Sequence, residues 1–303
     1  MQILVSGSQG FIGSALVPRL TSGGHRVIRL IRASGPLSSS PSEPRVAWNP
    51  AATTFDASAL DGLDAVIHLA GESLAAGRWT PARKAAIRES RVHGTRVLCE
   101  ALARLSKPPN VVIIASATGY YGDRGEEALT EASAPGSGFL AEVCRDWEQA
   151  AEPAARRGIR LVQARFGVVL SPSGGALAKM LMPFTLGCGG PLGHGWQYLS
   201  WVSIDDVLGA ILHLLTNDGV RGPVNIVSPQ PVTNRDFARA LGRVLRRPAL
   251  LSVPAFVLRL LLGELADEAL LASARVLPSK LLASGYTFRD PRVEDALRRL
   301  LGR

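Results

Sequence analysis

Short apolar runs alternate with amphipathic stretches through the first half of the chain. We expect strands at the apolar runs, which are residues 3–5, 27–31, 65–70, 111–116 and 159–165. Between them, apolar residues recur at three- and four-residue spacing, as in 11–20 and 81–105, and this spacing predicts helices. Strands without polar alternation are typical of a parallel sheet covered by helices on both faces. The pattern therefore predicts an α/β fold with a doubly wound parallel sheet.

The second half of the chain is organised differently. A loop region from 171 to 195 holds a glycine-rich segment, and more helical patterns follow it. Helix starts are predicted at Ser203 and Thr233, because each is followed three residues later by an aspartate. We expect a sheet domain at 1–170 to which part of 200–228 returns, substrate-side loops and helices at 171–250, and a small, mostly helical C-terminal domain at 251–303. The Ser- and Pro-rich stretch 33–44 predicts an exposed loop.

The first predicted strand leads into a glycine-rich turn with the sequence Gly7-Ser8-Gln9-Gly10-Phe11-Ile12-Gly13. Gly7 permits a tight turn, Gly10 lets the backbone approach a pyrophosphate, and Gly13 lets the next helix pack closely on the strand. The N-terminus of that helix offers free N–H groups and the positive end of its dipole. The turn therefore predicts a dinucleotide site in a Rossmann-type domain, with Gly7, Gln9, Gly10, Phe11, Ile12 and Gly13 around the cofactor.

The end of the second predicted strand indicates which nicotinamide cofactor is used. An NAD site usually has an acidic residue there, which accepts hydrogen bonds from the ribose 2′-hydroxyl. This strand ends at Arg32, and the next acidic residue is Glu43. Because a guanidinium binds a phosphate in a bidentate manner, we expect NADP(H), with Arg32 as the anchor of the 2′-phosphate and Arg29 as a less favoured helper.

Composition and charge limit the other function classes. The 303 residues carry a formal net charge of +9, yet the basic residues are mostly scattered arginines and form no long run. A basic stripe with interleaved aromatic residues is missing, so no specific nucleic-acid partner is expected, although a contact through the basic surface stays a third alternative. Three cysteines and five histidines show no ligand spacing, which argues against a disulfide framework and a metal site.

No signal peptide and no apolar run long enough to span a membrane are visible in the chain. Together with free cysteines, this predicts a cytoplasmic protein without a membrane partner. We expect a small-molecule substrate and either a monomer or a homodimer.

Several longer motifs carry a family resemblance. The form Gly-x-x-Gly-x-x-Gly with Phe11-Ile12 is similar to that of extended and atypical short-chain dehydrogenase/reductases. The chain as a whole resembles the epimerase family of NAD(P)-binding proteins, which are nucleoside-diphosphate-sugar epimerase-like and end in a small domain of unknown function. The matching segments are His68-Leu-Ala-Gly-Glu72, 77–91, Ser116-Ala-Thr-Gly-Tyr-Tyr-Gly122, 184–206 and 254–289.

The resemblance implies further cofactor contacts and an activity. It implies that Leu69, Ala70, Gly71, Glu72, Ala115 and Ser116 line the cofactor. Arg165 matches a position that faces cofactor or substrate in extended relatives, and a structural ion pair is an equal alternative. The implied activity is that of an NADP(H)-dependent oxidoreductase or epimerase-like enzyme on a small polar substrate, with nucleotide sugars among the candidates.

The usual catalytic unit of such enzymes, Tyr-x-x-x-Lys, is absent. Phe139 and Val143 stand near its two positions, and no lysine lies between 107 and 179. We therefore expect Tyr121 as acid or base and Ser116 as a donor to a substrate carbonyl, with Glu142 as a weaker candidate. Each has a plainer interpretation: a packed aromatic residue, a hydrogen-bonding residue at a strand end, and a surface acid, respectively.

Two functions therefore remain open from the sequence. Loss of the lysine favours a non-catalytic NADP(H)-binding sensor or regulatory protein. The glycine-rich segment 187–195 with His194, Gln197 and Trp201 favours an enzyme, because it would supply a substrate side. Trp48 either stacks on an adenine or packs in the core, and His68 is expected to be a core histidine.

Overall fold

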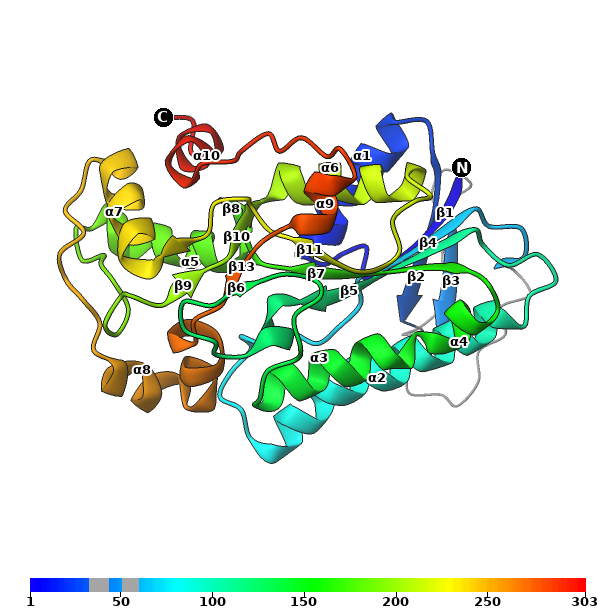
Figure 1. Ribbon diagram of the computed structural model, residues 1–303, viewed down its shortest axis with the longest axis horizontal. Helices are drawn as coiled ribbons and strands as arrows, with labels where there is room; N and C mark the ends of the chain where they lie inside the picture. Colours follow the sequence, from blue (N-terminus) through cyan, green and yellow to red (C-terminus); the bar gives the residue numbers. More distant parts are fainter. Residues whose placement is uncertain (33–43, 51–59) are drawn as a thin grey trace.

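A computed structural model describes residues 1–32, 44–50 and 60–303 (Figure 1). Within them, seven strands form one sheet in the order β11-β7-β5-β4-β1-β2-β3, and all neighbouring pairs are parallel. The strands are β1 (Gln2–Ser6), β2 (Arg26–Arg32), β3 (Arg45–Trp48), β4 (Ala65–His68), β5 (Val111–Ala117), β7 (Arg160–Phe166) and β11 (Gly222–Ile226). This order confirms the predicted doubly wound parallel sheet. The predicted loop at 33–44 lies, except for its last residue, outside the described residues.

Helices cover both faces of this sheet (Figure 1). One face carries α1 (Phe11–Ser22), α6 (Ile204–Thr216) and α9 (Ser279–Ala283), and the other carries α2 (Pro81–Ala103), α3 (Phe139–Ala150) and α4 (Glu152–Arg156). Side chains alternate between two apolar cores, since Ile3 and Val5 pack in one and Leu4 in the other. Burial of each such side chain contributes about 1.5–3 kcal/mol, which explains why the central strands β1, β4 and β5 are mostly apolar.

The chain returns to the sheet after a long excursion. The helix α6 packs on α1, and β11 then pairs in parallel with β7 at the edge of the sheet. The start of α6 has the predicted cap, because the Ser203 hydroxyl accepts a hydrogen bond from the Asp206 N–H. Thr233 caps α7 (Asn234–Leu245) in the same way through the N–H of Asp236.

The remaining elements form a C-terminal unit with its own apolar core. Its helices are α5 (Gly175–Thr185), α7, α8 (Ala255–Leu262), a π-helical turn η3 (Ala266–Leu271) and α10 (Val293–Leu300). Three short two-stranded pairs accompany them: β8 (Val168–Ser171) with β10 (Trp201–Ser203), β9 (Tyr198–Leu199) with β12 (Val232–Thr233), and β6 (Ala128–Leu129) with β13 (Arg275–Val276). The sequence did not predict these pairs, because two to four residues are too few to carry a period.

A buried carboxylate ties the end of the chain to the sheet domain. Asp206 accepts hydrogen bonds from the backbone N–H groups of Arg289 and Asp290 and from the Tyr286 hydroxyl.

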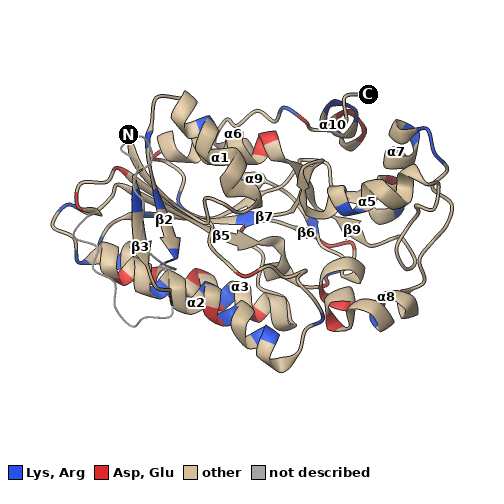
Figure 2. Ribbon diagram, turned by 180° about the vertical axis from the view of Figure 1, so that it is seen from behind, with Lys and Arg blue, Asp and Glu red and all other residues tan. Residues whose placement is uncertain are grey.

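Charged residues are spread over the ribbon, with basic and acidic positions interleaved on α2 (Figure 2). In the part of the chain that the structure describes, no helix combines the length and the apolar character that a membrane span needs.

Candidate functional site

A first cavity of about 480 Å³ lies beside the glycine-rich turn. Gly7 has φ +64°, and a Cβ atom there would lie 2.7 Å from the Leu69 carbonyl carbon. A Cβ atom on Gly13 would lie 2.2 Å from the Gly7 carbonyl oxygen, so both positions require glycine. The lining residues come from the turn and from the carboxyl ends of β2, β3 and β4: Gly7, Ser8, Gln9, Gly10, Leu30, Ile31, Arg32, Trp48, Pro50, Leu69, Ala70, Gly71 and, from α2, Ser90.

The groups at the bottom of this cavity suit a diphosphate. Gly10 is the N-cap of α1 and supplies no side chain to cap it, so the first N–H groups of the helix remain available. The Ser8 hydroxyl is buried and has no hydrogen-bond partner within the described residues. A buried hydroxyl and a free helix N-terminus together provide donors for an anion. The residues present therefore fit the diphosphate of a dinucleotide.

The mouth of the cavity carries an arginine. Arg32, at the carboxyl end of β2, lines the cavity and makes an ion pair of 3.2 Å with Glu72. Glu72 also contacts Arg83, at 3.3 Å, so its carboxylate joins two guanidinium groups. Arg29 is not among the residues that line the cavity. The geometry therefore favours Arg32 over Arg29 as the phosphate anchor.

Arg91 is a second arginine close to this cavity, and it was not predicted from the sequence. A Cβ atom on Gly71 would lie 3.4 Å from the guanidinium carbon of Arg91. The guanidinium lies over the Trp147 ring at 5.2 Å and donates to the Ile87 carbonyl oxygen. Burial lowers the pKa of Arg91 but leaves it a cation at neutral pH. The signal was present, because Arg91 ends one of the motifs of the family resemblance.

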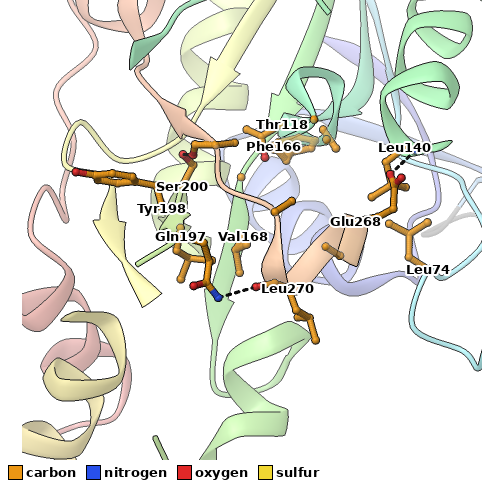
Figure 3. Close-up of a pocket in the computed structure, with 18 of the residues that line it drawn as sticks. Leu74, Thr118, Leu140, Phe166, Val168, Gln197, Tyr198, Ser200, Glu268 and Leu270 are labelled. Atoms are coloured by element: carbon orange, nitrogen blue, oxygen red, sulfur yellow. Dashed lines mark hydrogen bonds between the residues drawn. The ribbon is translucent and has the colours of Figure 1, made fainter. Parts of the chain in front are cut away.

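A second cavity, of about 220 Å³, lies at the carboxyl ends of β5 and β7 (Figure 3). Ala117 and Thr118 line it from the end of β5, and Phe166 lines it from β7. The C-terminal unit closes the opposite side with Gln197 and with residues 268–270 of η3. The segment from Leu69 to Leu74 connects the cavities, because its first residues line the first one and Leu74 lines the second.

Ser116 and Tyr121, the two predicted catalytic residues, lie outside the second cavity in a buried polar network. The Ser116 hydroxyl donates to Glu148 at 2.7 Å. Glu148 makes a bidentate ion pair with Arg165, and Arg165 donates to the Tyr121 hydroxyl at 2.9 Å. Both side chains are almost fully buried, so neither hydroxyl is presented to a ligand.

Tyr121 is held from several sides. Its hydroxyl lies 2.7 Å from Asn225 Oδ1 and 3.0 Å from the Thr130 carbonyl oxygen, both acceptors for its one proton. Burial raises the pKa of Tyr121, and the neighbouring Arg165 opposes that rise. This geometry argues against an acid–base role for Tyr121 and for the packed aromatic residue weighed above. Arg165 likewise takes the structural ion pair rather than a cofactor contact, since it lines neither cavity.

The residues of α3 that face the second cavity are shifted by one position from Phe139 and Val143, the positions expected from the sequence. Leu140 and Cys144 face Gly119, whereas Phe139 packs edge-on against Trp79. Leu140 and Cys144 are four residues apart, as the missing tyrosine and lysine would be. Burial raises the pKa of Cys144 to about 12, so it remains a thiol at neutral pH. Neither position on this face of α3 is a tyrosine or a lysine, so the Tyr–Lys pair is absent from it.

The other expected residues divide between contact and support. Phe11 packs on Gly174 and Gly175, and Ile12 packs on the core beside the turn. Ala115 is buried in β5 before the strand reaches the cavity. Trp48 is buried and also lines the first cavity, and His68 is buried beside Ser6. Glu142 is half exposed near Arg88, and His194 lies outside the second cavity.

Comparison with known proteins bears on this pair of cavities. The model of the NAD dependent epimerase/dehydratase family matches residues 3–227, and that of a domain of unknown function (DUF1731) matches residues 253–300. The chain belongs to the NAD dependent epimerase/dehydratase family. Both cavities lie largely on the part of the chain that this family model matches, and η3 comes from the domain of unknown function.

Relatives extend the similarity over the whole chain. Epimerase family protein Mb2239 of Mycobacterium bovis is 41% identical over 295 residues, which are 97% of this chain and 96% of that protein. The crystal structure of human epimerase family protein SDR39U1 with NADPH is 33% identical, has a TM-score of 0.90 and is covered to 99%. A nucleoside-diphosphate sugar epimerase structure from Corynebacterium glutamicum is 37% identical with a TM-score of 0.79, and this chain covers 58% of it.

Proposed function

We propose that this protein is an NADP(H)-dependent oxidoreductase of the epimerase family that acts on a small carbonyl or alcohol substrate. One observation carries the proposal: a cavity built for a dinucleotide and a second cavity lie along one edge of the sheet, joined by residues 69–74. Ligands of doubly wound sheets bind at this edge, outside the carboxyl ends of the strands. A substrate in the second cavity would then lie beside the reactive end of the cofactor.

The cofactor assignment rests on charge and on a relative. Arg32 at the end of β2 supplies a guanidinium where an NAD site has a carboxylate. The similar human protein is crystallised with NADPH. In our proposal, Arg32 binds the 2′-phosphate, Ser8 and the first N–H groups of α1 hold the diphosphate, and Arg91 adds a second positive charge near Gly71. The bound cofactor supplies or accepts a hydride.

The polar groups of the second cavity replace the missing catalytic unit in this proposal. The Thr118 hydroxyl lines the cavity and makes no hydrogen bond to the protein within the described residues. It follows the strand end directly, two residues after Ser116. A hydroxyl there donates a hydrogen bond to a substrate oxygen and stabilises the charge that develops on it. In carbonyl reduction the hydride from the cofactor forms the new C–H bond, and a solvent water protonates the substrate oxygen and leaves a hydroxide ion, which the bulk solvent neutralises.

A cofactor-turnover experiment tests this function against the sensor alternative. The purified protein is loaded with NADPH and mixed with a panel of aldehydes and ketones, and the absorbance of the reduced nicotinamide is followed. Substrate-dependent loss of that absorbance, reduced in a Thr118→Val variant, supports the enzyme. Tight NADPH binding without oxidation across the panel favours the sensor. The buried Tyr121 hydroxyl, which is bound to Arg165, is also consistent with a sensor.

Other expectations remain part of this proposal. The substrate is a small molecule, no nucleic acid or membrane partner is proposed, and the protein acts as a monomer or a homodimer. A cytoplasmic location is proposed as well, and Cys99, Cys144 and Cys188 are free cysteines in keeping with it.

A further inference from the structure

The second cavity has no cationic side chain in its lining, since neither lysine nor arginine is present there among the described residues. The charged side chain in the lining is Glu268, a carboxylate. Proteins bind phosphate groups with arginine, lysine or the free N-terminus of a helix. The side chains of this cavity therefore provide no partner for a diphosphate.

The helix N-terminus at the cavity is already filled by the chain itself. The Glu268 carboxylate accepts hydrogen bonds from the backbone N–H groups of Phe139 and Leu140, at 3.1 and 3.0 Å. These are the first two residues of α3, and the contact is drawn in Figure 3. A carboxylate at this position satisfies the donors and neutralises the positive end of the helix dipole. An anionic substrate would have to displace Glu268 and would be repelled by it.

The nearest buried cation is also unavailable. Arg165 lies behind the cavity wall, where its guanidinium is bound to both oxygens of Glu148 and to the Tyr121 hydroxyl. The Tyr120 ring stacks on the same guanidinium at 3.5 Å. Turning Arg165 towards a ligand would leave the buried Glu148 carboxylate without its cationic partner, which is strongly destabilising.

The size and shape of the cavity point to a small ligand. A volume of about 220 Å³ lies below the range of roughly 300–1,000 Å³ found for drug-sized ligands. This space suits a compact ligand better than a nucleoside diphosphate sugar, which has a base, two sugar rings and two phosphates. Most of the wall is apolar, and its larger side chains are Leu74, Leu140, Phe166, Val168 and Leu270 (Figure 3).

The uncharged polar residues in the lining are Thr118, Gln197, Tyr198, Ser200 and Asn234, and two of their polar groups suit a neutral ligand. One is the Thr118 hydroxyl. The other is the Gln197 carboxamide, whose nitrogen donates to the Leu192 and Leu270 carbonyl oxygens, each at 3.0 Å. These two bonds fix the amide, and its oxygen is buried with no partner in the described part of the chain. The Thr118 hydroxyl can donate to a carbonyl oxygen, the Gln197 amide oxygen can accept from a hydroxyl group, and neither supplies a positive charge to balance an ionised group.

We propose that the second cavity binds a small, uncharged, largely apolar carbonyl compound or the corresponding alcohol, and that it excludes nucleoside diphosphate sugars. This inference deepens the proposed function and rests on it for the position of the cofactor. Glu268 is the residue that sets the charge preference, because it fills the anion-binding end of α3. The apolar wall sets the preference for a compact hydrocarbon body.

A binding experiment on the NADP⁺-loaded protein tests the inference separately from turnover. Calorimetry compares three probes: cyclohexanone, which is small and neutral; pyruvate, which is small and anionic; and UDP-glucose, which is large and anionic. We expect binding of cyclohexanone, at least about tenfold weaker binding of pyruvate, and no binding of UDP-glucose. Binding of UDP-glucose or pyruvate as tight as that of cyclohexanone would overturn the inference.

Two variants locate the binding. Ala269 lines the cavity and is exposed, so Ala269→Phe should block the cavity without disturbing the core. Leu260, which is 70% exposed on α8 and lies outside the cavity, provides the matched control Leu260→Phe. We expect Ala269→Phe to weaken cyclohexanone binding at least about tenfold, with NADPH affinity unchanged in both variants. Equal cyclohexanone affinity in the two variants would place the ligand elsewhere and contradict the inference.

The readouts separate the two proposals. Cyclohexanone binding without loss of reduced nicotinamide would support the assigned ligand class and count against the oxidoreductase function. Reduction of NADP⁺ to NADPH with oxidation of a UDP-glucose hydroxyl would support the oxidoreductase function and overturn the ligand class.

Discussion

Arg32 and Glu72 form an ion pair of 3.2 Å at the mouth of the dinucleotide cavity, although forty residues separate them in the chain. Arg32 comes from the end of β2, and Glu72 follows the end of β4. The carboxylate therefore holds the guanidinium that the 2′-phosphate of NADP(H) would need. In this account, phosphate binding replaces one anionic partner of Arg32 by another.

The variant Glu72→Gln should bind NADPH more tightly. Removing the carboxylate ends its competition with the phosphate, and an exposed ion pair of this kind is worth about 0.2–1 kcal/mol. We expect NADPH affinity to rise by a factor of roughly 1.4 to 5, since 1.4 kcal/mol corresponds to a tenfold change. A fluorescence titration measures the change, and Glu264→Gln, which removes a distant partner of Lys84, is the control. Weaker NADPH binding in Glu72→Gln would mean that Glu72 supports the cofactor directly.

Gly13→Ala should damage both stability and cofactor binding. The new Cβ atom would lie 2.2 Å from the Gly7 carbonyl oxygen, so α1 must move away from β1. Overpacking of this kind typically costs about 1–3 kcal/mol or more. Gly94→Ala in α2 is the matched control, because its Cβ atom would meet Pro50 and Trp48 at an ordinary 3.5 Å and alanine favours the helix. Thermal unfolding should show a lower Tm for Gly13→Ala and an equal or higher Tm for Gly94→Ala.

Tyr121→Phe should lower stability and leave cofactor binding intact. The change removes the acceptor of the Arg165 guanidinium and the donor to Asn225 inside a buried network. Leaving buried polar groups unpaired costs about 1–3 kcal/mol. Denaturant unfolding measures that loss, and an NADPH titration should give an unchanged Kd. A variant with wild-type stability but no turnover would restore Tyr121 as the catalytic acid.

The buried His68 predicts a pH dependence of stability. Burial lowers the pKa of His68 to about 4, from an ordinary value of 6.5. Since the folded protein holds this histidine neutral, its contribution is complete above about pH 6.5 and declines as the pH falls towards 4. The full difference corresponds to roughly 3 kcal/mol, because one pKa unit is about 1.4 kcal/mol.

The window between pH 7 and pH 5 isolates this effect, because most carboxyl groups titrate below it. Ser6 Oγ lies 2.6 Å from His68 Nδ1, and Ser6 also accepts from the N–H groups of Leu69 and Ala70. Its own proton therefore goes to Nδ1, which requires the neutral ring. His68→Phe should remove the decline in unfolding free energy over this window, and an equal decline in both proteins would contradict the assignment.

The sheet and the glycine-rich turn could be predicted because each leaves a local signal. Apolar runs mark the central strands, and the spacing of Gly7, Gly10 and Gly13 marks the phosphate turn. The helix caps at Ser203 and Thr233 are local as well, and the structure confirms them. The position of Arg32 at the cofactor site could be predicted for the same reason, because it depends only on where β2 ends.

The second cavity could not be predicted, because it depends on distant segments. Thr118 and Glu268 line it from elements 150 residues apart, and no pattern in the chain links them. Strand alternation alone does not tell whether Ser116 or Thr118 meets the cavity at the end of β5. The buried contacts of Tyr121 could not be predicted either, because its partners Asn225 and Arg165 lie on other strands.

The preference for NADPH over NADH tests the account most directly. Both cofactors are titrated into the wild-type protein and into Arg32→Ala, with Arg26→Ala at the far end of β2 as the control. We predict that the wild-type protein and Arg26→Ala bind NADPH at least about tenfold more tightly than NADH, and that Arg32→Ala binds the two cofactors equally. Equal affinities in the wild-type protein, or an unchanged preference in Arg32→Ala, would contradict the account.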